Sequence, residues 1–352
     1  MSRLPGLNPP KSAARNAAEP HQVPEADEVS WQREMADAIC DPAELLECLQ
    51  LTPADVPDAD VSGDSLFRTL VPRSFVRRMK PGDPADPLLR QVLPMMSERR
   101  HVDGFVPDAV NDHAAHRAPG LLQKYAGRVL LIASGACAVH CRYCFRREYP
   151  YGREPRRLKD WRTALNAIRD DSSISEVIFS GGDPFMLNDR RLSELCRLAD
   201  EISHVERIRF HTRLPVVLPS RVTPELLTLL TSLRSQAVIV IHANHGNEIV
   251  DDCADALRSI VRSGLPVLNQ TVLLKGINDS VDVLRDLSRR LINTGVMPYY
   301  LHQLDQVAGT AHFQVDAARG RVLVDELAKQ LPGYAVPRFV QEVAGEASKR
   351  PA

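Results

Sequence analysis

From residue 128 onward the sequence alternates between short apolar runs and longer amphipathic runs, and this pattern limits the fold more than any other feature. The apolar runs are rich in Val, Ile and Leu, as is typical of parallel strands covered by helices. Predicted strands lie at 129–133, 176–180, 207–212, 237–243, 267–274 and 296–302. Predicted helices lie at 159–171, 189–201, 223–233, 251–263, 282–293 and 317–330. Because six such units are too few to close an eight-stranded barrel, we expect an α/β fold with an incomplete (β/α)6 barrel. A doubly wound sheet is the alternative.

Four regions follow from this pattern. Residues 1–30 carry few large apolar groups, so we expect a disordered N-terminal arm. Residues 31–120 contain short helical patterns and several prolines, which predicts a mostly helical N-terminal cap. The barrel core is predicted for 121–333. Residues 334–352 are a C-terminal extension that begins with an extended run, 334–340.

The charge and the cysteine count narrow the classes of partner and compartment. A formal net charge of −1 gives no electrostatic reason to expect nucleic acid or an anionic membrane as a partner. No apolar run approaches the roughly 18 residues of a membrane span, and the first 30 residues lack the apolar core of a signal peptide. Seven cysteines, an odd number, suit reduced thiols better than a disulfide framework. We therefore expect a cytoplasmic protein.

Cys137, Cys141 and Cys144 follow the predicted strand 129–133 with C-x3-C-x2-C spacing. Three thiolates on one loop can bind three irons of a [4Fe–4S] cluster, whose usual complement is four cysteines, so the fourth iron stays open to another ligand. Two alternatives remain. With His140, the cysteines would form a Cys3His zinc site, or they are simply buried small hydrophobic side chains.

A second motif, Ser180-Gly181-Gly182-Asp183, ends the predicted strand 176–180. The glycine pair would let a ligand approach the backbone, and the Asp183 carboxylate can accept hydrogen bonds from an ammonium group. The alternative is a tight turn that needs glycine for a positive φ. Both motifs are predicted at the carboxyl ends of strands, where α/β barrels place their active sites.

Together, these motifs resemble a known family. The cysteine spacing, Tyr143 before the third cysteine and the Arg146-Arg147 pair resemble the radical S-adenosylmethionine (SAM) family. The run Cys-Arg-Tyr-Cys-Phe-Arg-Arg at 141–147 resembles more narrowly its lysine 2,3-aminomutase branch, as do the segments 211–219 and 269–274. The resemblance implies a radical SAM barrel with three cofactors, namely a [4Fe–4S] cluster, SAM and pyridoxal 5′-phosphate (PLP). The SAM contacts that it implies are Ser180, Gly181, Gly182, Asp183 and Gln270.

By the same resemblance, Lys349 carries the PLP, because Pro-Arg-Phe-Val at 337–340 is followed by a loop of small residues that leads to this lysine. Charge statistics alone would make Lys349 a solvated tail residue. The resemblance implies that Lys124, Tyr125 and Arg128 surround the PLP phosphate and ring.

The resemblance also implies a substrate site for L-lysine. Arg146 matches the arginine that binds the substrate carboxylate, a role suited to a bidentate guanidinium. Asp305 and Glu342 match the two carboxylates that bind the ε-ammonium group, although Glu342 stands where the family usually has an aspartate. Two anions that face one buried cation are expected for a lysine side chain.

The implied activity is that of an isomerase, an L-lysine 2,3-aminomutase that forms β-lysine by a 5′-deoxyadenosyl radical and a PLP aldimine. The short chain and the segment Val-Pro-Arg-Ser-Phe at 71–75 resemble the bacterial subgroup that makes (R)-β-lysine for elongation factor P modification. This implies a functional link to that factor and its β-lysine ligase, and an electron donor such as flavodoxin. Ser280 stands where longer relatives have a zinc-binding cysteine, so no structural zinc is expected.

Two other functions stay open from the sequence, and so does assembly into a homo-oligomer. The first is a radical SAM aminomutase that acts on another amino acid or on protein-attached lysine. The second is a zinc-dependent binding protein without catalysis.

Overall fold

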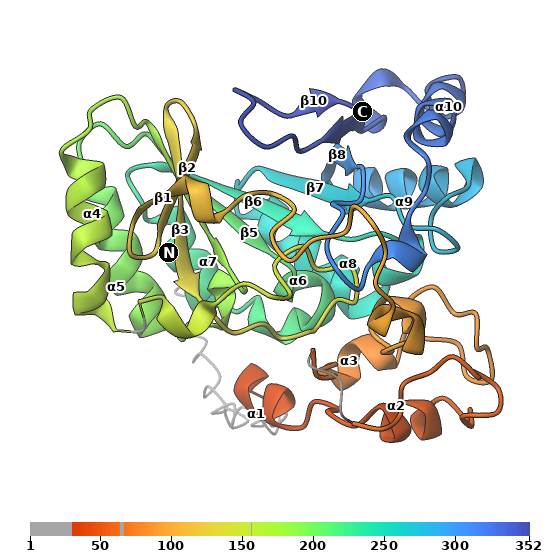
Figure 1. Cartoon of the computed structure of the whole chain (residues 1–352). Coiled ribbons are helices and arrows are strands. Elements are labelled where there is room, and N and C mark those ends of the chain that lie inside the picture. Colours follow the sequence, from red (N-terminus) through yellow and green to blue (C-terminus); the bar gives the residue numbers. More distant parts are fainter. Residues whose placement is uncertain (1–29, 64–66, 156) are drawn as a thin grey trace, which may run out of the picture.

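The computed structural model describes residues 30–63, 67–155 and 157–352. Apart from Ser30, the predicted N-terminal arm lies outside the described residues. The described chain forms a ten-stranded sheet in which the strands follow one another in chain order (Figure 1). The strands are β1 (His116–Ala118), β2 (Leu121–Tyr125), β3 (Arg128–Ser134), β4 (Glu176–Gly181), β5 (Arg207–Thr212), β6 (Gln236–His242), β7 (Val267–Val272), β8 (Met297–His302), β9 (Arg338–Gln341) and β10 (Arg350–Pro351).

The order of the strands decides between the two predicted folds. Strands β3 to β9 are all parallel, and each pairs with its neighbour in the chain. A doubly wound sheet would reverse its strand order at a switch point, and this sheet does not. Strands β1, β2 and β10 extend it through antiparallel pairs and leave it open at both edges. The result is the expected incomplete barrel, lengthened beyond the six predicted strands.

All six predicted strands and all six predicted helices are present, with ends within three residues of the prediction. The α-helices are α1 (Trp31–Ala36), α2 (Pro42–Cys48), α3 (Arg73–Val76), α4 (Arg162–Arg169), α5 (Asp189–Asp200), α6 (Leu214–Val217), α7 (Pro224–Thr231), α8 (Asp251–Arg262), α9 (Val281–Asn293) and α10 (Ala317–Ala328). Short 3-10 helices are η1 (Leu89–Gln91), η2 (Met96–Arg99), η3 (His113–Ala115), η4 (Tyr151–Arg153), η5 (Leu158–Trp161), η6 (Pro184–Met186), η7 (Pro219–Arg221), η8 (Gly246–Glu248), η9 (Ala311–Phe313) and η10 (Gly333–Ala335).

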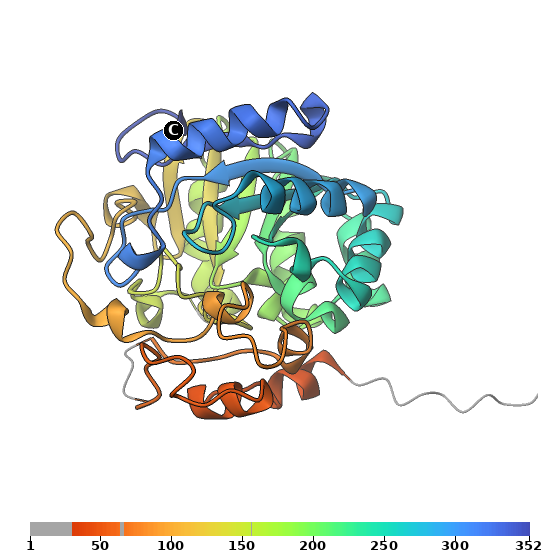
Figure 2. The ribbon, with the colours of Figure 1, turned by 90° about the vertical axis from the view of Figure 1, so that its right-hand side faces the viewer.

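The N-terminal cap packs directly on the barrel. Its described residues form short helices joined by turns, and the strand β1 near its end joins the sheet. Figure 2 shows the first part of the cap, in red, on the side of the molecule opposite the blue helix α10. One apolar cluster runs from cap residues such as Trp31 and Phe75 to barrel residues such as Val129 and Leu257. The cap and the barrel therefore share a hydrophobic core.

Backbone hydrogen bonds also tie the cap to the cysteine loop. The His140 amide donates to the Leu70 carbonyl at 3.0 Å, and the Arg142 amide donates to the Gln91 carbonyl at 2.8 Å. Both donors lie between the first and last cysteines of the motif. The cap thus fixes the backbone of the loop that carries the cysteines.

The C-terminal extension folds back along the sheet. Strand β9 pairs in parallel with β8, and β10 then pairs antiparallel with β9, with Arg350 opposite Gln341. This hairpin brings the end of the chain to the barrel. The extended run predicted at 334–340 is correct only from Arg338, because Gly333–Ala335 forms the 3-10 helix η10 and the strand β9 begins after Pro337. In the part of the chain that the structure describes, no helix has the length and apolar character needed to span a bilayer.

Candidate active site

A cavity of about 850 Å³ lies between the cysteine loop and the C-terminal extension. Strand residues such as Leu130, Ile178, Val238 and Leu268 form its walls. Every residue that the sequence predicts for the site also lines it, namely Lys124, Tyr125, Arg128, Cys137, Cys141, Cys144, Arg146, Ser180, Gly181, Gly182, Asp183, Gln270, Asp305, Glu342 and Lys349. Its volume falls in the range of roughly 300–1,000 Å³ that is typical of small-molecule sites. Residues predicted for the cluster, SAM, PLP and substrate thus share one cavity.

The three motif cysteines are free thiols on the loop that follows β3. Burial raises the pKa of Cys144 to about 11 and that of Cys137 well above its ordinary value. Thiols in such surroundings become thiolates only when a nearby positive charge, such as bound iron, compensates the cost of burial. The donors are therefore suited to a metal group and not to free thiolate chemistry.

The geometry separates the cluster from the zinc alternative. Across the described residues, no three His, Cys, Asp or Glu side chains converge on one ion position. A cluster needs separated thiolates because each binds a different iron. His140 Nδ1 lies 2.8 Å from the Arg68 carbonyl oxygen, and its ring stacks on Phe67 with centroids 4.9 Å apart. The separated thiols fit a [4Fe–4S] cluster better than the single tetrahedral ion of a Cys3His zinc site.

Gly181 and Gly182 hold the start of the cysteine loop. A Cβ atom on Gly181 would lie 2.3 Å from the Ser134 carbonyl oxygen, and one on Gly182 would lie 2.4 Å from the Ala136 carbonyl oxygen. Gly181 also has a φ of +115°, which side chains disfavour. Backbone hydrogen bonds form at the same place. The Gly182 amide donates to the Ser134 carbonyl, and the Asp183 amide donates to the Ala136 carbonyl. The glycine pair is needed so that the backbone just ahead of the first cysteine can pack against β4.

The Asp183 carboxylate joins two barrel loops. It accepts hydrogen bonds from the Thr212 hydroxyl at 2.8 Å, the Arg213 amide at 2.6 Å and the Phe185 amide at 3.0 Å. Burial raises its pKa to about 6. Protein donors thus occupy much of the carboxylate that was predicted to bind the SAM ammonium. Its observed contacts fix the end of β5 beside the cysteine loop.

Arg213 reaches from that position to the cysteines, and sequence reasoning gave it no role. Its Nη1 donates to Cys141 Sγ at 2.7 Å, while Nη2 donates to Gln91 Oε1 at 2.7 Å and Glu248 Oε2 at 3.0 Å. The side chain is buried. The only signal in the sequence was its place in the recognised segment 211–219.

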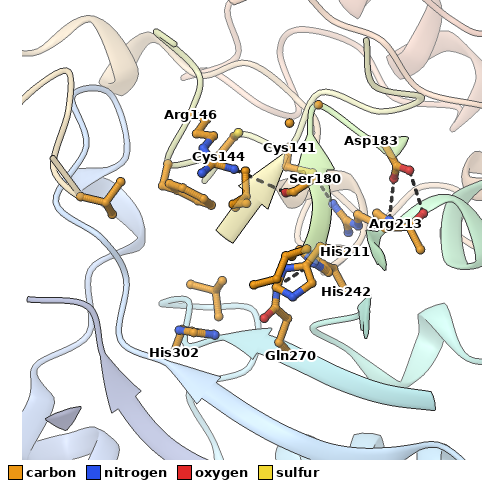
Figure 3. A pocket seen from close by; sticks show the side chains of 18 of the residues that line it. Cys141, Cys144, Arg146, Ser180, Asp183, His211, Arg213, His242, Gln270 and His302 are labelled. Carbon is orange, nitrogen blue, oxygen red and sulfur yellow. Dashed lines mark hydrogen bonds between the residues drawn. The ribbon is translucent and has the colours of Figure 1, made fainter. Parts of the chain in front are cut away.

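The opposite wall of the cavity carries imidazoles. Figure 3 shows His211, His242 and His302 with Gln270 across from Cys141 and Cys144. Burial lowers the pKa of His242 to about 3 and lowers the pKa values of His211 and His302. Gln270 Nε2 lies 2.7 Å from His242 Nε2. These rings are therefore neutral polar groups at physiological pH, and Gln270 is tied to one of them.

A buried aspartate connects two of the predicted basic residues. Asp112 Oδ2 accepts from Arg146 Nε at 2.7 Å, and its Oδ1 lies 2.8 Å from Lys124 Nζ. Arg146 Nη1 also lies 3.4 Å from the Ser180 hydroxyl. Asp112 was not recognised in the sequence, because nothing in its local pattern shows that it meets Arg146. It fixes the direction of the Arg146 guanidinium.

Lys349 lies against one of the two predicted substrate carboxylates. Its ammonium pairs with Glu342 Oε2, and Tyr125 donates to Glu342 Oε1 at 2.6 Å. Although burial opposes it, the Lys349 charge lowers the pKa of Glu342 below its ordinary value. Among the described residues, Asp305 forms no ion pair, and burial raises its pKa to about 6. One carboxylate is occupied and the other is open.

The far end of the cavity is basic. Arg128, Arg209 and Arg338 line it. The Arg128 guanidinium lies 4.5 Å from the centroid of the Tyr125 ring, and Arg209 pairs with Glu176 at 2.9 Å. Arg209 and Arg338 were missed because they belong to two separate strands, β5 and β9, and only the folded sheet brings both to one cavity.

Comparison with known proteins decides the family. Residues 131–287 match the model of the Radical SAM superfamily. The chain is 42% identical over 323 residues to an L-lysine 2,3-aminomutase from Haemophilus influenzae, covering 92% of this chain and 95% of that protein. The Escherichia coli protein of the same name is 42% identical over 321 residues, which cover 91% and 94% of the two chains. One from Clostridium subterminale is 32% identical over 330 residues, covering 94% of this chain and 79% of its own.

The chain belongs to the L-lysine 2,3-aminomutase family. It is an isomerase of the radical SAM class, and membership implies a [4Fe–4S] cluster, SAM and PLP as its cofactors. The cavity agrees with this membership. Its cysteine end has the thiol donors for a cluster, and its other end has a lysine amine beside guanidinium groups that suit a phosphate. The residue types present therefore fit the groups that an L-lysine 2,3-aminomutase uses.

Proposed function

We propose that the protein converts L-lysine to β-lysine. The observation that supports this most is the charge pattern of the cavity, which has a fixed guanidinium at Arg146 and two carboxylates, Asp305 and Glu342. A free amino acid with a cationic side chain would present a carboxylate to the first and an ammonium to the second. A neutral or acidic side chain would leave a buried carboxylate unpaired, which is costly.

We assign the substrate carboxylate to Arg146. Asp112 holds its Nε, so the remaining N–H groups of the guanidinium are directed by a fixed partner and can bind a carboxylate in a bidentate manner. Arg146 is buried, and a charge-assisted hydrogen bond is stronger where water is excluded. Orientation of the amino acid would therefore be set before any chemical step.

We assign the ε-ammonium group to Asp305 and Glu342. Asp305 is open, whereas Glu342 is paired with Lys349. The Lys349 side chain must turn away before Glu342 can receive a second cation, while the backbone beside it stays fixed by the pairing of β10 with β9. Binding of the cofactor to Lys349 would therefore free Glu342 and complete the substrate site.

The cofactors would be held at opposite ends of the cavity. Cys137, Cys141 and Cys144 would hold the cluster, and Lys349 would hold PLP with Arg128, Arg209 and Arg338 near its phosphate. When bound, the cluster with SAM supplies a 5′-deoxyadenosyl radical, and PLP supplies the group that carries the migrating nitrogen. The chain itself orients the amino acid and excludes water from the space between.

We further propose (R)-β-lysine as the product and elongation factor P modification as its use. The support is the segment resemblance together with identity, since the chain is 42% identical to the Haemophilus influenzae and Escherichia coli proteins and 32% identical to the Clostridium subterminale protein. We also propose a flavodoxin-type electron donor, because the cluster must be reduced, and a cytoplasmic location, because the cluster is sensitive to oxygen. Chiral analysis of the product tests the first of these statements.

A panel of amino acids tests the substrate. Protein reconstituted with iron, sulfide and PLP would be incubated with SAM, dithionite and either L-lysine, L-norleucine, L-glutamate or lysine attached to elongation factor P. We expect turnover with L-lysine alone. Turnover with protein-attached lysine, or with norleucine at an equal rate, would contradict the assignment of free lysine through its ammonium.

A further inference from the structure

Arg213 connects a motif cysteine to a buried acid. Its Nη1 donates to Cys141 Sγ, and its Nη2 donates to Glu248 Oε2. Glu248 is completely buried and also accepts from the Asn244 and His245 amides. The Arg213 guanidinium thus contacts the Cys141 sulfur through one nitrogen and its counter-ion, Glu248, through the other.

Four residues from the loop after β4, the cap and the cysteine loop hold this arginine in place. Asp183, after β4, accepts from its backbone amide at 2.6 Å. Gln91, in the cap, accepts from its Nη2 and donates to Glu248 Oε1 at 3.1 Å. The rings of Phe75 and Tyr143 flank the guanidinium, with centroids 5.4 and 5.6 Å away. A side chain fixed from so many directions has few other orientations.

We propose that Arg213 is a positioning residue that sets the reduction potential of the cluster through Cys141. Hydrogen bonds and positive charge at a ligand sulfur stabilise the reduced, more negative cluster, so they raise its potential. Glu248 opposes this effect because its negative charge offsets that of the guanidinium. The step concerned is the transfer of one electron from an external reductant to the oxidised cluster, with no bond made or broken.

This role is independent of the amino acid substrate. It rests on the cluster and on the Arg213 contacts and not on lysine, PLP or the direction of the isomerisation. A failure of the lysine assignment would leave it intact, and the converse also holds. The measurement can therefore be made without SAM or lysine.

The test is a redox titration of the reconstituted protein, in which electron paramagnetic resonance measures the amount of reduced cluster at each potential. Arg213→Gln removes the cation and should shift the midpoint to more negative potential. Glu248→Gln keeps a similar shape but removes the anion, so it should shift the midpoint to more positive potential. We expect at least a tenfold change in the reduction equilibrium in each case, which is about 59 mV for one electron.

Arg221→Lys is the control, because Arg221 is also buried but bonds to the Phe185 and Leu187 carbonyl groups and pairs with Asp189. Its midpoint should match that of the unchanged protein. Iron and sulfide content would be measured for every variant, and if Arg213→Gln fails to assemble a cluster, the sign of the Glu248→Gln shift decides. Midpoints that stay unchanged, or a Glu248→Gln shift to more negative potential, would overturn the proposal.

Discussion

The two ends of the cavity differ in how their charges are satisfied. At the cysteine end, Arg213 pairs with Glu248, while Arg142 and Arg147 share Glu98. At the lysine end, Asp305 and Arg128 form no ion pair with any described residue. The arginines named at the cysteine end are paired within the protein, whereas Asp305 and Arg128 at the lysine end are not.

The difference shows where ligand charge is expected. A buried network of paired groups rigidifies its surroundings, which suits a loop that must hold an inorganic cluster in one geometry. Unpaired charges in a cavity are costly unless a ligand completes them. The lysine end therefore favours a zwitterionic substrate with an extra cation and a cofactor with a phosphate. The predictions below test first one end and then the other.

Removal of a motif cysteine should have the largest effect. Cys144→Ala deletes one of the three cluster donors, so iron per chain should fall sharply and β-lysine formation should drop to background. Iron and sulfide assays with the visible absorption of the anaerobic protein would measure this. Cys253→Ala, which changes a buried cysteine of α8, should keep its cluster; equal loss in both variants would argue against the motif.

Substitution of the tail lysine should disable the other end alone. Lys349→Arg keeps a cation near Glu342 but cannot form an imine with PLP, so borohydride should trap no cofactor on the chain while the iron content stays normal. Mass spectrometry of the reduced protein locates the adduct. Lys329→Arg, at an exposed lysine paired with Glu326, is the control. An adduct that persists in Lys349→Arg would contradict the assignment.

Asp305→Asn should weaken lysine binding without harm to the cluster. Removal of one partner of a buried charge pair costs about 2–5 kcal/mol, so the KM for L-lysine should rise at least about 30-fold. Steady-state kinetics at saturating SAM would show it. Asp325→Asn, on the exposed face of α10, should leave KM unchanged. An unaltered KM in Asp305→Asn would favour a substrate without an ε-ammonium.

The same carboxylate predicts a pH dependence. Burial raises the pKa of Asp305 to about 6, so it is charged above this pH and becomes neutral below it. As pH falls through 6, kcat/KM for lysine should therefore fall, by about tenfold per pH unit below the pKa of the free enzyme. The profile of Asp305→Asn should lack this limb; a limb that remains would assign the titration to another group.

Asp112→Asn should have the smallest effect of this series. Asparagine can still accept one hydrogen bond from Arg146 but has no charge to share with Lys124. Loss of one charge-assisted bond is worth about 1.5–3 kcal/mol, so KM should rise by about tenfold or more while kcat changes less. A fall in kcat as large as the rise in KM would indicate a general disturbance of the site and not the positioning of Arg146.

Much of this arrangement was predictable from local patterns. Short-range hydrophobic periodicity in the sequence predicts strands and helices, and the expected strands and helices are all present. The motif cysteines, Ser180 to Asp183 and Lys349 each belong to a recognisable segment, and the fold brings them to one cavity.

What the sequence could not show depends on long-range contacts. Arg213 meets Glu248 and Cys141 across loops that follow different strands, and Asp112 meets Arg146 only because the cap closes over the barrel. The parallel pairing of β9 with β8 likewise arises only when the chain returns after α10. Such contacts have no periodic signature, so only the folded chain shows them.

The most direct measurement follows L-lysine deuterated at C3 through the reconstituted protein in the presence of SAM, PLP and dithionite. We expect β-lysine to form and deuterium to enter the 5′-deoxyadenosine pool, since Arg146 and Asp305 would hold the amino acid between the two ends. Absence of β-lysine from protein with a full complement of iron and trapped PLP, or β-lysine formed with no transfer of label, would contradict the account.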